Sequence, residues 1–198
     1  MAFLISSRHW RNGRRCVLSG VWFAALALLL LGGLNLAAQP VATKEYQIKA
    51  VFLFNFSQFV EWPTNAFPET QTPLVIGVLG EDPFGAYLEE TVRGETVNNH
   101  PLVIQHYRHA EDIKACHILF ISQSEAGRLD RIFEGLKGRN ILTVGDVEGF
   151  AQRGGMIRFI TEKNKIRLRI NLEAAKAASL TISSKLLRPA EIVAPGKD

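Results

Sequence analysis

The densest apolar pattern in the chain lies between Lys49 and Pro63, a stretch with four phenylalanines, one tryptophan and no internal Gly or Pro. At about 100° per residue, one face of a helix here is apolar and the opposite face is polar. The apolar face holds Phe52, Leu53, Phe56, Phe59 and Val60, and the polar face holds Lys44, Gln47, Asn55, Gln58 and Glu61. The pattern predicts an amphipathic helix that Pro63 ends.

Two apolar residues of this helix, Val51 and Phe54, point toward the polar stripe. An apolar side chain on a polar face is either covered by another part of the chain or available to a partner. In the first interpretation, the C-terminal segment packs over Val51 and Phe54. In the second interpretation, these two residues belong to a docking surface.

Four continuous apolar runs follow, at 74–80, 102–107, 117–121 and 140–144, and helical patterns separate several of them. Runs rich in Val, Ile and Leu are typical of parallel strands that are covered on both faces. Asp82 and Pro83 predict a helix start, with Asp as the cap and Pro in the first turn. Ser122 or Ser124 is the predicted cap of the next helix.

The C-terminal third has a different pattern, because the runs 156–160 and 166–170 alternate apolar residues with arginine. This predicts an antiparallel hairpin with one wet face at the edge of the same sheet. Asn171 predicts a helix cap, residues 179–184 an interruption, and Pro189 the end. We therefore expect an α/β three-layer sandwich, with a mostly parallel sheet of about five to six strands, a C-terminal antiparallel hairpin and flanking helices.

The N-terminal segment has the layout of a secretory signal peptide. Four arginines precede an apolar run from Val17 to about Leu34, and Ala38 offers the cleavage site, with Ala42 as a later one and an uncleaved anchor as the alternative. We therefore expect a signal peptide over 1–38, one domain over 39–198, and a periplasmic protein. About 160 residues are enough for a single domain with its own core.

Removal of that segment changes the charge. The whole chain carries 23 basic and 19 acidic residues, and the four arginines before Val17 account for the excess of +4. The remaining domain is electrically balanced, which argues against nucleic-acid binding. Cys116 alone would survive cleavage, so no internal disulfide can form, and we expect a buried thiol.

Signatures of catalysis are missing from the sequence. There is no phosphate-binding Gly-Lys-Ser/Thr loop and no Gly-x-Ser-x-Gly turn. His106, His109, Glu111 and His117 have the chemistry of metal ligands, but no helix fixes two of them on one face. We predict no catalytic residue, no metal site and no cofactor.

Two surfaces remain as candidates. Ligands of doubly wound sheets bind beyond the carboxyl ends of the strands, where Gly80, Asp82, Ser122 and Asp146 form a candidate crevice; helix caps and tight turns need the same residue types. Arg158, Arg167 and Arg169 lie on the polar face of the hairpin. They predict either a solvated edge that discourages aggregation or a basic docking strip.

Several motifs in order resemble the YfiR-like family. They are Lys49-Ala50, Phe52 to Phe56, Phe59 to Pro63, Val78 to Gly80, Asp82 to Phe84, Cys116 to Ser122, Gly149 to Ala151, Gly154 to Ile157, Ile170 to Leu172 and Ser184 to Leu187. The resemblance covers essentially everything after residue 43.

The resemblance implies a non-catalytic periplasmic regulator that binds the periplasmic sensory domain of an inner-membrane diguanylate cyclase. Such binding lowers cyclic-di-GMP signalling and hence biofilm formation. Relief by an outer-membrane lipoprotein and a homodimer are further implications. Candidate partner-binding residues are Val51, Phe54, Trp62, Arg158, Arg167 and Arg169. The alternative is a periplasmic small-molecule sensor or binding module that uses the crevice at the carboxyl ends of the strands.

Overall fold

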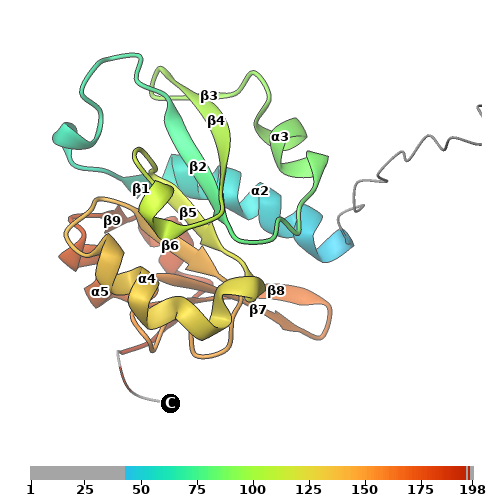
Figure 1. Ribbon diagram of the computed structural model, residues 1–198. Coiled ribbons are helices and arrows are strands. Elements are labelled where there is room, and N and C mark those ends of the chain that lie inside the picture. Colours follow the sequence, from blue (N-terminus) through green and yellow to red (C-terminus); the bar gives the residue numbers. More distant parts are fainter. Residues whose placement is uncertain (1–42, 195, 197–198) are drawn as a thin grey trace, which may run out of the picture. The chain divides into compact units, whose positions relative to one another are not determined.

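The computed structural model describes residues 43–194 and residue 196 (Figure 1). The predicted signal peptide lies outside these residues. The α-helices are α2 (Lys44–Phe59), α3 (Ala86–Val92), α4 (Leu129–Leu136), α5 (Leu172–Ala177) and α6 (Ser184–Leu187). Short 3-10 helices are η1 (Thr64–Ala66), η2 (Ala110–Asp112) and η3 (Gln123–Arg128).

The strands form one large sheet and one small ribbon. They are β1 (Val60–Glu61), β2 (Leu74–Leu79), β3 (Thr96–Val97), β4 (His100–Tyr107), β5 (Ile118–Ile121), β6 (Leu142–Gly145), β7 (Ile157–Glu162), β8 (Lys165–Ile170), β9 (Thr181–Ile182) and β10 (Glu191–Ile192). The large sheet has eight strands in the order β10-β8-β7-β6-β5-β2-β4-β3. Strands β4, β2, β5, β6 and β7 are parallel to their neighbours in that order.

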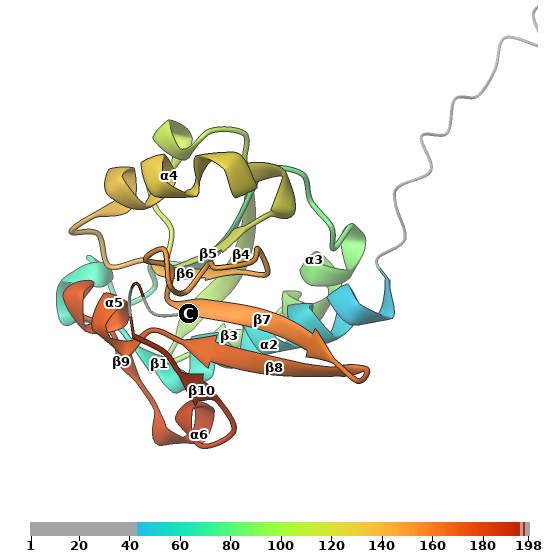
Figure 2. The same cartoon turned by 90° about the horizontal axis from the view of Figure 1, so that it is seen from below.

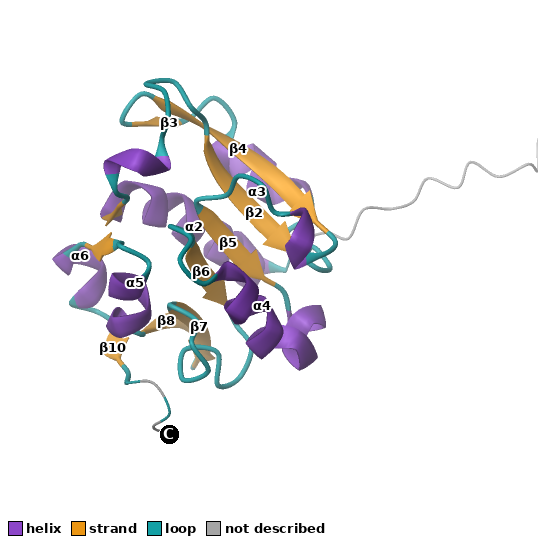
Figure 3. Cartoon of the chain, turned by 60° about the vertical axis from the view of Figure 1, so that its left-hand side comes forward, coloured by secondary structure: helices purple, strands orange, loops and turns teal. Residues whose placement is uncertain are grey.

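The predicted α/β three-layer sandwich is confirmed. Helices α2 and α3 pack on one face of the sheet, and α4 packs on the other (Figure 2, Figure 3). Alternate strand residues divide between two cores, so that Ile76 and Phe120 face α2 and α3, whereas Leu79 and Leu119 face α4. The sheet has more strands than expected, because β3 and β10 are two-residue strands without a readable hydrophobic period.

The C-terminal hairpin forms as predicted, with β7 and β8 antiparallel and β7 parallel to β6. The hairpin is not the outermost element, however. Strand β10 adds to β8 in parallel, with Glu191 beside Arg169 and Ile192 beside Ile170. The extreme edge on this side is therefore two residues long.

The first helix ends earlier than Pro63. Val60 is its C-cap in an extended conformation, and Val60 and Glu61 pair with Ile182 and Thr181 as the β1–β9 ribbon. Pro63 would stop the helix as predicted, but the pairing of Val60 and Glu61 with the distant strand β9 ends the helix before Pro63 is reached.

The helix predicted to begin at Pro83 begins instead at Ala86. Asp82 Oδ1 accepts a hydrogen bond from Phe84 N at 2.8 Å, which makes a local turn, and Gly85 with φ of 56° is the N-cap. Two other cap predictions are confirmed, since Ser122 caps η3 and Asn171 caps α5.

Candidate functional site

The outward face of α2 carries an apolar patch. Ile48 is 39% exposed and Val51 is 41% exposed, and both are large hydrophobic residues. Phe54, one turn after Val51, is half-buried against the core. We call Ile48, Val51 and Phe54 the α2 patch. The C-terminal segment does not cover it, because that segment contacts the far end of α2, where Lys185 Nζ lies 5.3 Å from the Phe59 ring centroid.

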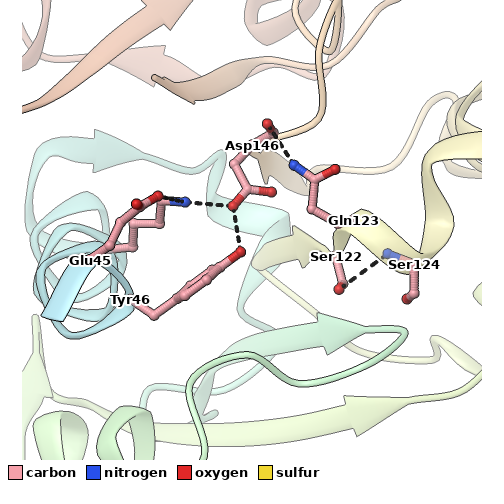
Figure 4. A network of polar contacts seen from close by, with 7 residues as sticks. Glu45, Tyr46, Ser122, Gln123, Ser124 and Asp146 are labelled. Carbon is pink, nitrogen blue, oxygen red and sulfur yellow. Dashed lines mark hydrogen bonds and ion pairs between the residues drawn. The ribbon is translucent and has the colours of Figure 1, made fainter. Parts of the chain in front are cut away.

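The inward face of α2 carries a buried charge. Lys49 is 2% exposed, and its Nζ donates to Asp146 Oδ2 at 2.5 Å and pairs with Glu45 Oε1 at 2.6 Å. The Tyr46 hydroxyl donates to the same Asp146 oxygen at 2.9 Å. Figure 4 shows Glu45 and Tyr46 of α2 beside Asp146, which directly follows β6. We call Tyr46, Lys49 and Asp146 the carboxyl-end clamp.

The charges of this clamp are stabilised in place. The hydrogen bond from Lys49 is the main cause that lowers the pKa of Glu45. Burial, followed by the negative charge of Asp146, raises the pKa of Tyr46, so its hydroxyl stays protonated and remains a donor. Lys49 Nζ also lies 4.3 Å from the Tyr46 ring centroid, a cation–π distance. The clamp fixes α2, and with it the α2 patch, to the sheet.

The crevice residues lie at the carboxyl ends of β2, β5 and β6, as their sequence positions predict. Most of their polar groups serve local structure. Asp82 Oδ2 lies 3.3 Å from His106 Nε2, and Ser122 caps η3. The side chains of Ser124 and Glu125 fill the space beside Gly80, and Ser124 Oγ accepts from Glu81 N at 3.0 Å.

Asp146 is the exception among these four. Its side chain is 6% exposed, yet its Oδ1 atom is buried without a hydrogen-bond partner among the described residues. Arg158 Nε is in the same condition, and Arg158 pairs in register with Gly145, next to Asp146. Burial, and then the positive charge of Arg169, lowers the pKa of Arg158. A donor and an acceptor are thus left unsatisfied in one region.

The three hairpin arginines share one face, since Arg158 is directly opposite Arg169 and Arg167 is two residues away on β8. Arg169 Nε pairs with Glu191 at 2.8 Å, and Arg167 Nε pairs with Glu162 at 3.5 Å. Arg167 is the most exposed of the three arginines, with 60% of its side chain accessible to solvent. The strip exists geometrically, but acidic neighbours offset much of its charge.

At the opposite end of the sheet, Trp62 belongs to an aromatic cluster. The Phe67 ring stacks between His100 at 4.0 Å and His117 at 4.4 Å, and Trp62 meets Phe67 edge-on. His117 Nδ1 accepts from Val75 N at 3.1 Å, and Nε2 lies 3.2 Å from the Ala66 carbonyl oxygen. We call Phe67, His100 and His117 the amino-end clamp, because it holds the loop before β2.

The remaining groups with reactive chemistry are arranged for structure. No group of three potential metal ligands occurs among the residues that the structure describes. Burial raises the pKa of the Cys116 thiol to about 12, which suits an inert core residue. A shallow pocket of about 470 Å³ between η2 and α4 is lined by internally paired groups, Arg128 with Glu125 and Arg131 with Glu111. Within the described part of the chain, no helix is long and apolar enough to span a bilayer.

Sequence reasoning missed Ile48 and the Lys49–Asp146 pair. A lysine on the apolar side of an amphipathic helix is a usable signal, because a buried ammonium needs an acid. The helical period places Lys49 on the same side as Leu53 and Phe56. Ile48 adjoins Val51 by helical spacing and extends the patch predicted from Val51 and Phe54.

Comparison with protein families matches residues 46–191 to the model described as YfiR/HmsC-like. The match spans the described fold from the first turns of α2 to β10. No curated protein matches the chain.

Proposed function

Because the chain belongs to the YfiR/HmsC-like family, we propose that it is a non-catalytic periplasmic regulator of a membrane diguanylate cyclase. In this proposal it binds the cyclase's periplasmic sensory domain and favours an inactive conformation. Differential affinity for two states is sufficient to lower cyclic-di-GMP output, and with it biofilm formation. A signal peptide over 1–38 and an outer-membrane lipoprotein that relieves the repression are parts of the same proposal.

The observation that carries the proposal is the α2 patch. Exposed apolar side chains on an otherwise well-packed helix are typical of docking surfaces. Ile48 and Val51 extend outward from a helix whose other side is fixed by Lys49 and Asp146. A pre-organised face loses little conformational freedom on binding, which favours affinity.

The proposed interface also includes the other predicted contact residues, which are Trp62 and the three hairpin arginines. Arg167, the most exposed arginine, suits the rim of an interface, where charge affects association rate more than affinity. Trp62 packs against Phe67 and His117, so we assign it a supporting role for the surface around the amino-end clamp. Arg158 and Arg169 complete the proposed strip.

The test is binding of the purified protein to the periplasmic domain of a candidate membrane cyclase. Val51→Asp places a charge at the centre of the α2 patch, and we expect a loss of affinity of about 2 kcal/mol or more, the size of a hot-spot effect. The free energy of unfolding should change by about 0.5 kcal/mol or less, since Val51 is exposed.

Gln71→Asp is the control, because it introduces the same charge at an exposed residue of the loop before β2. It should bind like the wild type. Equal affinities for Val51→Asp and Gln71→Asp would reject the α2 patch as the docking surface. Turnover of a substrate by the purified protein would reject the regulator itself.

A second function, a periplasmic small-molecule sensor, is favoured by one observation. Asp146 Oδ1 and Arg158 Nε are a buried acceptor and a buried donor without partners among the described residues, and both residues lie at or beside the carboxyl end of β6. A polar metabolite that satisfies both would raise the melting temperature by mass action. A metabolite whose stabilising effect disappears in Arg158→Met but persists in Arg167→Met would support this function.

A further inference from the structure

Strand β4 lies at one margin of the large sheet, and most of its outer edge has no strand beside it. In the described part of the chain, β3 pairs with β4 only at His100 and Pro101, and β2 pairs with the other side of β4 from Leu102 to Tyr107. Figure 1 and Figure 3 show β4 at the margin of the sheet, with β3 beside one end only. The stretch 103–107 is therefore a free edge.

The features that protect the opposite side of the sheet are missing from β4. Strand β8 carries Lys165, Arg167 and Arg169, and charged side chains of this kind discourage the addition of another strand. Strand β4 has no Lys, Arg, Asp or Glu anywhere in its sequence. Its only proline, Pro101, lies at the end that β3 already covers. An extended segment can therefore add to β4 more easily than to β8.

The free backbone groups of β4 belong to two residues. Leu102 N donates to Glu95 O on the outer side, whereas Tyr107 O accepts a hydrogen bond on the β2 side. Backbone groups alternate along a strand, so the N–H and the C=O of both Ile104 and His106 point outward. An antiparallel strand with one residue opposite each of them would form four backbone hydrogen bonds.

Carboxylates gather beside this free edge. His106 Nε2 lies 3.3 Å from Asp82 Oδ2 and 3.9 Å from Glu89 Oε1, and both acids are partly exposed. Asp82 comes from the loop after β2 and Glu89 from α3. Residues 81–108 include five acidic residues and only two basic ones. The face of the free edge that carries α3 is therefore acidic.

This charge selects among the strands that could add. An antiparallel second copy would bring another Asp82 and Glu89 to the same face of the joined sheet, and like charges oppose that arrangement. A segment with Lys or Arg opposite His106 would instead meet both carboxylates. Two positions further on, its side chain would lie beside Ile104, which is half-buried against the core and suits an apolar neighbour.

We propose that β4 binds an extended basic segment of another protein as an added antiparallel strand. The segment has Arg or Lys opposite His106, any residue next, and then Ile or Val opposite Ile104. Its backbone hydrogen bonds supply affinity, and its alternate side chains supply specificity. This surface lies on a different element from the α2 patch, so it is separate from the proposed regulation of a cyclase.

A synthetic peptide tests the register directly. The probe is acetyl-Thr-Arg-Thr-Ile-Thr-amide, added to isotope-labelled protein purified after expression of the full sequence. At saturating peptide, amide hydrogen exchange at Ile104 and His106 should slow by about tenfold or more, because their N–H groups become bonded. Exchange at Val103 and Gln105 should not change, because their amides already face β2. This alternation is the signature of an added strand.

The contribution of charge is tested by exchanging it between the two sides. A peptide with Glu in place of Arg should bind about threefold more weakly or worse, the size of a cross-strand charge effect. Glu89→Arg should reverse the preference between the two peptides. Glu134→Arg, at an exposed glutamate of α4, is the matched control and should keep the preference of the wild type.

A proline variant tests the backbone. His106→Pro removes only an outward N–H and leaves the pairing with β2 intact, so it should abolish binding, whereas His106→Ala should keep it. Unchanged exchange at Gln105 verifies that the variant retains the sheet.

Three results would overturn the proposal. The first is equal slowing at Val103, Ile104, Gln105 and His106, or none, and the second is equal affinity for the Arg and Glu peptides. The third is protection of Ile104 and His106 that rises with protein concentration without peptide, since a second copy would then occupy the edge.

Discussion

Different interactions fix the segments that pack at the two ends of the parallel strands. At the carboxyl end, α2 is fixed by charge, with Lys49 and Tyr46 on one oxygen of Asp146. At the amino end, the loop before β2 is fixed by ring stacking, with Phe67 between His100 and His117. Both clamps join segments that are distant in sequence.

The two clamps respond differently to the loss of one member. A buried ion pair contributes little beyond the cost of desolvating its members, but loss of one member leaves a bare charge. A stack of aromatic rings loses only its own contacts when one ring is removed. We therefore expect one substitution in the carboxyl-end clamp to lower the free energy of unfolding more than one substitution in the amino-end clamp. The contribution of the amino-end clamp should also decrease at acid pH.

The largest effect should come from Lys49→Met. It leaves Asp146 charged and buried, and we expect the free energy of unfolding to fall by about 3–5 kcal/mol in denaturant titration. The double variant Lys49→Met with Asp146→Leu removes both charges and should recover most of that loss.

Lys176→Met is the matched control, because Lys176 pairs with Glu173 at 3.1 Å on the surface, with 68% of each side chain exposed. Its cost should be about 0.5 kcal/mol or less. If the double variant were no more stable than Lys49→Met, charge burial would not explain the clamp.

His117→Leu should have the next largest effect, about 1–3 kcal/mol, because it leaves Val75 N–H without its acceptor. It should also change the pH dependence. Burial lowers the pKa of His117 from 6.5, so the unfolded chain takes up a proton that the folded chain refuses. Wild-type stability should fall as pH drops below about 6.5, until the lowered pKa of the folded state is passed.

Comparing unfolding curves of both proteins between pH 7.5 and 5 isolates this contribution. The difference in stability between wild type and His117→Leu should shrink as the pH falls. His109→Leu, at an exposed histidine, is the control. A difference that stays constant over this range would mean that His117 keeps an ordinary pKa in the folded protein.

The smallest effect should come from Phe67→Leu. Leucine keeps much of the apolar contact but loses the stacks on His100 and His117, each worth about 0.5–1.5 kcal/mol at most. Two stacks at the lower end of that range give an expected decrease of about 1 kcal/mol in the free energy of unfolding, measured by thermal unfolding. A cost as large as that of Lys49→Met would erase the distinction between the two clamps.

Much of the fold could be predicted because its strands are strong local signals. Leu74–Leu79 is buried along its whole length, and its continuous apolar sequence indicates cover on both faces. Strands β3 and β10 gave no such signal, since two residues show no period. Val60 and Glu61 fit the helical pattern of the residues before them, and their extended form depends on pairing with Ile182 and Thr181.

The candidate site was less accessible from the sequence. Val51 and Phe54 could be singled out by their angle on the helix, and Ile48 by the same reasoning. The Lys49–Asp146 pair joins residues 97 positions apart, and nothing local indicates which acid meets the lysine. The place of each strand in the sheet could not be predicted either, because periodicity does not supply the strand order.

The β1–β9 ribbon makes the two ends of the domain depend on each other. Val60 directly follows α2, but its partner Ile182 lies near the other end of the domain. Until the C-terminal segment has folded, the aromatic end of α2 has no ribbon to fix it, and closing so long a loop carries an entropic cost. We expect this end of α2 to be exposed, and prone to aggregation, before folding is complete.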